Sequence, residues 1–163
     1  MNERSPAVEI RRAGPRGWAT VRRLRLDALR ESPFAFLGSY AVEQAWTPAR
    51  WRRACVEAVW FVASVEGAPV GLTRVARYPD EPRHIESMWV APEYRKCGVA
   101  AALLAMAERS VRARGDLQIG LWVYDGNDVA RQFYEEMGYR LVDRRDYAPA
   151  QDGRTEREFL KQL

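Results

Sequence analysis

The stretch that most constrains what this chain can fold into is residues 88–101, Met-Trp-Val-Ala-Pro-Glu-Tyr-Arg-Lys-Cys-Gly-Val-Ala-Ala. Residues 84–90 mix β-branched, aromatic and apolar side chains, and Pro92 stops this run as the end of a strand requires. From Gly98 onward apolar side chains recur every four residues, which is the spacing of one helix face. They are Val99, Leu103, Ala107 and Val111. The sequence therefore predicts a strand, a short polar turn and a long helix in succession.

The start of this predicted helix is suited to bind an anion. A helix start has backbone N–H groups without intrahelical partners and carries a partial positive charge. Arg95 and Lys96 precede it, and Gly98 and Ala100 have little or no side chain, so a phosphate can approach the N–H groups closely. The turn is neither a Walker A loop nor a dinucleotide fingerprint, because it lacks both Gly-Lys-Ser/Thr and G-x-G-x-x-G.

A second motif lies further along the chain. It consists of Asn127, Ala130, Phe133, Tyr134, Gly138 and Tyr139 in the pattern N-x-x-A-x-x-F-Y-x-x-x-G-Y. With the R-x-x-G-x-A of the turn after a strand, this pair of motifs resembles the acyl-CoA signature of the GCN5-related N-acetyltransferases, the GNAT superfamily. The order of the predicted elements is similar to that family over nearly the whole chain.

The resemblance implies acetyl-CoA as co-substrate and names the residues that hold it. The end of the strand would contact the pantetheine and thioester through backbone groups of Met88, Trp89 and Val90. The turn would hold the pyrophosphate. Its residues are Arg95, Lys96, Cys97, Gly98, Val99, Ala100 and Ala101. Asn127 would contact the cofactor arm, and Tyr134 would lie beside the sulfur. Capping of the following helix is the alternative role for Asn127, and the two roles can coexist.

Acetyl transfer to an amine needs a neutral amine, a stabilised oxyanion and a protonated leaving thiolate. A lysine-type amine with a pKa of ~10.4 is neutral in about one of ~2,500 molecules at pH 7, so a base is useful. Glu86, acting through a water, is the candidate base because strand alternation places it on the face of Val90. Pairing of Glu86 with Arg74 or Arg83 is the alternative. The N–H of Val90 is the candidate oxyanion donor.

Tyr134 is the candidate acid that protonates the thiolate, and the alternative for it is a core aromatic. His84, two residues from Glu86, is a second candidate base, although a surface position is the simpler interpretation. The family often has a carboxylate five residues before the Asn of the second motif, and that position is Trp122 here. Cys97 in the turn resembles a nucleophile, but transfer in this family is direct, so its presence is interpreted as incidental.

The predicted fold is α+β, a single domain over residues 1–163 built on a mixed, mostly antiparallel sheet flanked by helices. The resemblance implies that strands 84–90 and 117–124 splay apart. The other predicted strands are residues 8–12, 58–65 and 69–78, with a terminal hairpin of 139–145 and 155–160. The other predicted helices run from 14 to 32, from 47 to 58 and from 128 to 137. Residues 34–46 are expected to be irregular.

The composition of the chain argues against several classes of protein. No apolar run approaches the ~20 residues that span a bilayer, residues 1–7 lack the apolar core of a signal peptide, and one His with two distant Cys gives no metal site. We therefore expect a cytoplasmic protein without metal or membrane contacts. Seven arginines between positions 11 and 30 form a basic region. A solvated helix face is preferred for it over nucleic-acid binding.

The acceptor is expected over residues 34–51 and 143–155, where aromatics with Glu43 and Glu86 suit a cationic amine. A small-molecule amine is the first choice, and a protein N-terminus or lysine is the second. A non-catalytic acyl-CoA sensor is the competing class. The oligomeric state is not set by the sequence, and a homodimer is left open.

Overall fold

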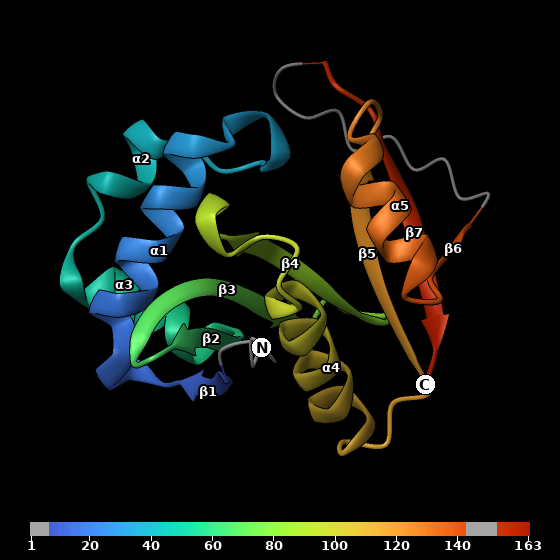
Figure 1. Cartoon of the computed structure of the whole chain (residues 1–163), viewed down its shortest axis with the longest axis horizontal. Helices are drawn as coiled ribbons and strands as arrows, with labels where there is room; N and C mark the ends of the chain where they lie inside the picture. The colour runs from blue at the N-terminus through green and yellow to red at the C-terminus, as the bar shows by residue number, and fades with distance from the viewer. Residues whose placement is uncertain (1–6, 143–152) are drawn as a thin grey trace, which may run out of the picture.

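The computed structural model describes residues 7–142 and 153–163 and contains a seven-stranded mixed sheet of order β1-β2-β3-β4-β5-β7-β6 (Figure 1). Its strands are β1 (Val8–Ala13), β2 (Val59–Val65), β3 (Ala68–Ala76), β4 (Arg83–Val90), β5 (Gln118–Tyr124), β6 (Arg140–Leu141) and β7 (Glu156–Gln162). Its helices are α1 (Trp18–Glu31), α2 (Tyr40–Gln44), α3 (Pro48–Glu57), α4 (Val99–Arg112) and α5 (Asp128–Glu136). The predicted α+β fold with a mixed, mostly antiparallel sheet is confirmed.

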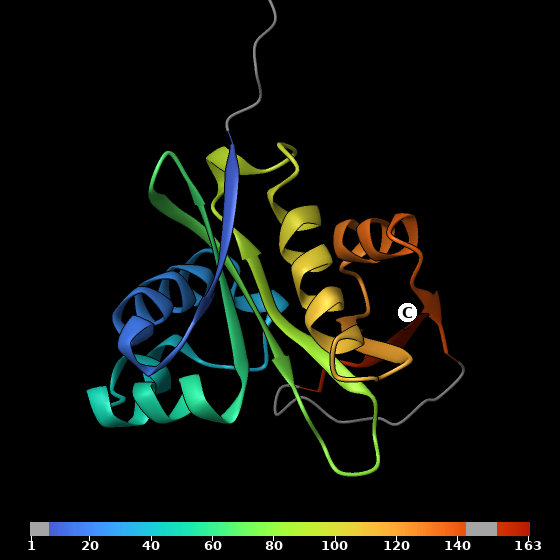
Figure 2. The same cartoon turned by 90° about the horizontal axis from the view of Figure 1, so that it is seen from below.

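Helices cover both faces of the sheet, with α1 to α3 on one side and α4 and α5 on the other (Figure 2). Each side has its own core. The α1 side is built on Trp51, Trp60, Leu24 and Leu72, and the α4 side on Leu103, Ile119, Leu121 and Phe159. The helix face predicted from the four-residue spacing is buried as expected, because its four side chains are all 1% exposed or less.

Strands β4 and β5 form the one parallel pair of the sheet described here, and they pair only where each begins. Residues 83–85 of β4 face residues 119–121 of β5, and the two strands diverge beyond that point (Figure 1). The expected splayed pair is therefore present. The edge of β4 that faces the gap has no strand partner in its second half, so its backbone groups need partners other than a strand.

A β-bulge in β4 overturns one expectation. Glu86 pairs with Arg74 of β3, but the next pair in register joins Trp89 to Leu72, so two residues of β4 stand opposite one of β3. The extra residue is Ser87, which has a positive φ of 55°. Because a bulge shifts side-chain alternation by one residue, Glu86 lies on the face of Trp89 and not on that of Val90. The prediction that Glu86 shares a face with Val90 is wrong.

Several further predictions need correction or limits. Residues 34–46 are not wholly irregular, because they contain α2. His84 is not at the surface but fully buried, and Arg25 does not belong to a solvated helix face, since it is 8% exposed. The terminal hairpin exists as β6 and β7, but most of the acceptor loop expected at 143–155 and nearly all of the N-terminal residues 1–7 lie outside the described residues. No helix within the described ranges is long and apolar enough to cross a membrane.

Candidate functional site

The turn after β4 leads into α4 through a glycine in the left-handed region. Residues 92–94 form one 3₁₀ turn, and Gly98, with φ of 81°, is the N-cap of α4. A Cβ added at Gly98 would meet nothing within 4 Å, and no side chain caps the helix start. The first turn of α4 contains no acidic residue. Its N–H groups are therefore open to an anionic ligand.

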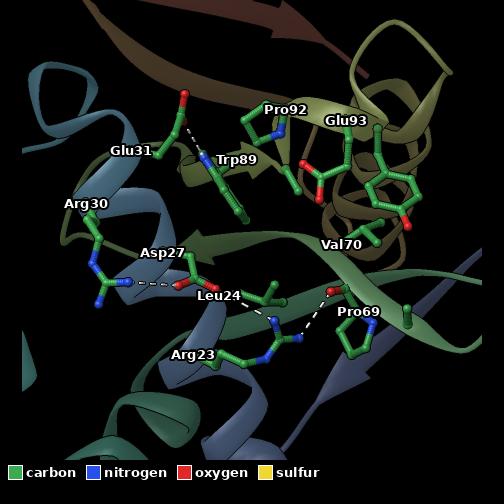
Figure 3. Close-up of a pocket in the computed structure, with 13 residues that line it drawn as sticks. Arg23, Leu24, Asp27, Arg30, Glu31, Pro69, Val70, Trp89, Pro92 and Glu93 are labelled. Carbon is green, nitrogen blue, oxygen red and sulfur yellow. Dashed lines mark hydrogen bonds and ion pairs between the residues drawn. The ribbon is translucent and has the colours of Figure 1, made fainter.

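The Arg95 side chain is already engaged by neighbouring groups. Its Nε donates to the Val90 carbonyl at 2.9 Å, and its Nη2 donates to Glu31 Oε2 at 2.6 Å. The Trp89 indole Nε1 donates to the same oxygen of Glu31 at 3.0 Å (Figure 3). Arg95, together with Ser32 and Trp89, lowers the pKa of Glu31 to about 2. The last residue of α1 thus ties the end of β4 to the turn.

A mostly apolar cavity of about 350 Å³ opens between the end of β4, the segment before α2, and α5. Some of the residues predicted to bind the cofactor line this cavity. They are Met88, Trp89, Val90, Arg95, Ala100, Asn127 and Tyr134. Phe34, Phe36, Val129 and Phe133 are among the other residues that line it. The structure therefore brings both motifs to one cavity. Lys96, Cys97, Gly98, Val99 and Ala101 do not line the cavity and instead form the adjacent helix start.

Two residues of the second motif have clear structural roles. Asn127 caps α5, because its Oδ1 accepts from the Ala130 N–H at 3.2 Å. Tyr134 is 7% exposed and packs edge-on against Phe133 and Tyr139. Burial raises the pKa of Tyr134, so its hydroxyl carries a proton at neutral pH. Both residues still face the cavity.

The same Trp89–Glu31 contact borders a second recess, of about 460 Å³, between α1 and the beginning of β3 (Figure 3). Several charged side chains at the rim of this recess pair with one another or with the backbone. Arg23 donates to the Pro69 carbonyl at 3.1 Å, and Asp27 lies 3.7 and 3.9 Å from the guanidinium groups of Arg23 and Arg30.

The candidate base Glu86 does not line the cavity. Its carboxylate accepts hydrogen bonds from Arg74, through Nε at 2.7 Å, and from the Tyr78 hydroxyl at 2.5 Å. Burial and the carboxylate of Glu86 raise the pKa of Tyr78 to about 12. The alternative of an ion pair with Arg74 is thus what the structure contains.

His84 forms a buried pair with a residue that the sequence did not single out. Its Nε2 lies 3.3 Å from Oε1 of Glu158, which is 2% exposed, and its ring stacks on Trp122 with centroids 6.2 Å apart. Glu158 is on β7, more than 70 residues away, so no local pattern signalled this pair. In the region described, no group of three or more His, Cys, Asp or Glu side chains is arranged to hold a metal ion.

Glu43, expected to attract a cationic amine, is also paired. It accepts two hydrogen bonds from Arg25, and both side chains are nearly buried. Sequence reasoning missed this pair because Arg25 sits among exposed arginines. Cys97 is exposed, with its Sγ 3.4 Å from the Arg95 carbonyl.

Comparison with known proteins gives one family and a consistent fold. The sequence model described as the Acetyltransferase (GNAT) family matches residues 18–139. A PaiA N-acetyltransferase from Thermoplasma acidophilum, solved with coenzyme A, superposes with a TM-score of 0.73 at 18% identity, covering 96% of this chain and 99% of that one. The ribosomal-protein-S18-alanine N-acetyltransferase from Escherichia coli gives 0.69 at 18% identity, with 96% and 94% covered. A putative streptothricin acetyltransferase from Bacillus anthracis, solved with acetyl coenzyme A, gives 0.59 at 18%, with 66% and 63% covered.

Proposed function

This chain belongs to the acetyltransferase (GNAT) family, and we propose that it moves an acetyl group from acetyl-CoA directly to a primary amine of a small molecule. One observation carries the proposal. The cavity at the end of β4 lies beside an uncapped helix start with no acidic residue in its first turn, and Tyr134 faces that cavity. An anionic head group and an apolar arm fit these two neighbouring features.

The residues present suit acetyl-CoA. The N–H groups at the start of α4, with Lys96, would hold the pyrophosphate, and the apolar cavity would take the pantetheine arm. The N–H of Ala91 donates to the Val70 carbonyl at 2.8 Å, so strand alternation turns the N–H of Val90 toward the gap. That N–H is our oxyanion donor, and one such donor is typically worth ~3 kcal/mol of barrier.

Tyr134 supplies the proton for the departing thiolate in this proposal. Its raised pKa makes it a weaker acid than free tyrosine, which taken alone disfavours the transfer. A thiolate that forms in the same apolar cavity is also poorly solvated, however, so desolvation raises the pKa of the thiol as well. Proton transfer between two groups that share one apolar site therefore costs less than the pKa of Tyr134 alone indicates.

Glu86 remains our candidate base, acting through a water from outside the cavity. Its signature would be a loss of kcat/KM in Glu86→Gln that becomes smaller as the pH rises toward the pKa of the amine. If Glu86→Gln leaves the pH profile unchanged, the amine loses its proton without help from Glu86.

The proposed acceptor can be compared with those of the solved structures that this chain resembles. Two of the solved structures named above are described with different acceptors: one is a ribosomal-protein-S18-alanine N-acetyltransferase, and the other is a putative streptothricin acetyltransferase. The first supports a protein N-terminus as the second candidate acceptor for this chain. The carboxylates of Glu43 and Glu86 are both engaged by arginines. Recognition of an amine therefore relies less on free negative charge than the sequence indicated.

The deciding experiment measures thiol release from acetyl-CoA with a panel of amines and N-terminal peptides, with calorimetric binding of acetyl-CoA in parallel. Tyr134→Phe should lower kcat at least tenfold with binding nearly intact, and Gly98→Glu should abolish binding by bulk and charge in the turn. Turnover of peptides alone would replace the small-molecule acceptor. Binding without turnover on any acceptor would favour an acyl-CoA sensor, and absence of binding would refute the proposal.

A further inference from the structure

A buried ion pair joins α1, α2 and the bulge of β4. Arg25 donates to Glu43 twice, from Nε to Oε2 at 2.9 Å and from Nη2 to Oε1 at 2.8 Å. Its third nitrogen, Nη1, donates to the hydroxyl of Ser87 at 3.3 Å. The two charged side chains are only 9% and 8% exposed. All three guanidinium nitrogens therefore have partners, and one of those partners is the bulge residue itself.

The surroundings leave this pair little freedom to move. A Cβ added at Gly38 would collide with both Glu43 and Arg25, so the backbone of the segment before α2 lies directly against the pair. The Arg25 guanidinium also lies 5.1 Å from the centroid of the Phe36 ring, and Phe36 lines the cavity of about 350 Å³. Two walls of the cavity, the segment before α2 and the end of β4, thus meet at one ion pair.

Stability alone does not account for a pair of this kind. Removing two charges from water is costly, and replacing a buried ion pair by apolar residues of similar size is often neutral or stabilising. A bidentate guanidinium–carboxylate pair does, however, fix geometry strongly. The main role of the Arg25–Glu43 pair is therefore to fix the position of the groups that it contacts.

Through its contact with Ser87, the Arg25–Glu43 pair holds a backbone conformation that serine rarely adopts. Ser87 has φ of 55°, which costs a non-glycine residue free energy and persists only where the surroundings hold it. The bulge at Ser87 sets which way the following residues point. Met88, Trp89 and Val90 all line the cavity. A small rotation at Ser87 would therefore turn the N–H of Val90 away from the gap.

We infer that Arg25 and Glu43 are positioning residues for acetyl transfer: they hold the Ser87 bulge so that the end of β4 presents its free N–H to the thioester. This inference rests on the proposed function for its chemical consequence but not for its structural one. Neither side chain lines the cavity, so both act through Ser87 and the strand end.

The test uses two variants that break the link from opposite sides. Arg25→Met/Glu43→Leu removes both charges together and leaves no buried charge unpaired. Ser87→Ala removes the hydroxyl that Arg25 contacts, keeps the Cβ so that the positive φ remains costly, and does not disturb the ion pair. Arg83→Met is the matched control, because it breaks an ion pair of 2.7 Å with Asp116 at the other end of the same strand.

Two readouts separate this inference from the proposed function. Amide hydrogen exchange of the peptide covering residues 87–90 is measured without ligand or acceptor. Both test variants lose a hydrogen bond to a charged group, so exchange there should rise about tenfold or more in each of them. Exchange at the start of α4 should stay within twofold, and Arg83→Met should leave residues 87–90 unchanged. Exchange within twofold of wild type in both test variants would overturn the inference, whatever the enzyme assay shows.

Kinetics then test the chemical consequence with an acceptor that wild type turns over. Both variants should lose about tenfold in kcat while KM for acetyl-CoA changes less than twofold, because the phosphate turn is intact. Faster exchange with unchanged kcat would refute a positioning role. If wild type acetylates none of the amines or peptides, the proposed function fails, and the exchange result still decides whether the pair holds the bulge.

Discussion

Replacing Glu31 by glutamine should weaken the fold in a pH-dependent way. The Glu31 carboxylate accepts hydrogen bonds from Arg95, Trp89 and Ser32, and these lower its pKa from 4.5 to about 2. The difference between these values corresponds to about 3 kcal/mol. Because 35% of the Glu31 side chain is exposed, solvent screening reduces the contribution, and we expect about 1–2 kcal/mol at pH 7.

The sign follows from the direction of the pKa change. A carboxylate whose pKa is lower in the folded state stabilises that state above its unfolded pKa, and the contribution is lost as the pH falls through the folded pKa. For Glu31 the window runs from 4.5 down to about 2. Less than half of the contribution should remain near pH ~3.3, because a contribution reduced by solvent screening to about 1–2 kcal/mol is lost closer to the unfolded pKa than the full difference would be.

Urea unfolding followed by tryptophan fluorescence measures this contribution. The free energy of unfolding of Glu31→Gln should lie about 1–2 kcal/mol below wild type at pH 7, and the gap should be less than half as large at pH ~3.3. Glu57→Gln is the matched control, because its exposed pair with Arg53 one helical turn away should contribute no more than ~0.5 kcal/mol. A gap of equal size at both pH values, or no larger than that of the control, would refute the reasoning.

Two further substitutions test the packing beside the site. Gly71→Ala should lower the free energy of unfolding by about 1–3 kcal/mol, because the new Cβ would lie 2.9 Å from the Trp89 carbonyl oxygen. The control Gly14→Ala meets nothing within 4 Å and should change the free energy of unfolding little. Equal melting temperatures for the two variants would contradict this. His84→Leu should cost about 1–3 kcal/mol, because it leaves Oε1 of Glu158 buried without the ring nitrogen that lies 3.3 Å away. Adding Glu158→Leu should recover part of that loss, and strict additivity in urea titrations would show that the two residues are not coupled.

Local signals predicted the parts of the site that are built from neighbouring residues. The four-residue spacing after Gly98 gave the buried face of α4, and Gly98 adopts the left-handed conformation that a glycine at a helix start permits. Asn127 caps α5 as its residue type favours. Each of these features depends on residues within one or two turns of each other, so their order in the chain carries the information.

The features that the sequence did not yield depend on contacts between distant elements. The bulge at Ser87 escaped prediction because no glycine marks it, and it reversed the face on which Glu86 lies. Arg25 looked like one of several exposed arginines until Glu43, 18 residues away, was seen to accept its hydrogen bonds. His84 is buried only because β7 brings Glu158 beside it. Long-range pairing of this kind leaves no periodicity in the sequence.

These distant contacts converge on the end of β4 for a physical reason. A strand inside a sheet is normally held along both edges, but β4 loses its β5 partner after residue 85, and the open edge is where the proposed acyl transfer needs free backbone groups. Side chains of α1 instead hold the side chains of this strand end and of the turn after it. Arg25 holds Ser87, and Glu31 holds Trp89 and Arg95. Substitutions on α1 that touch no substrate should therefore affect the geometry of the site more strongly than substitutions of similar burial elsewhere.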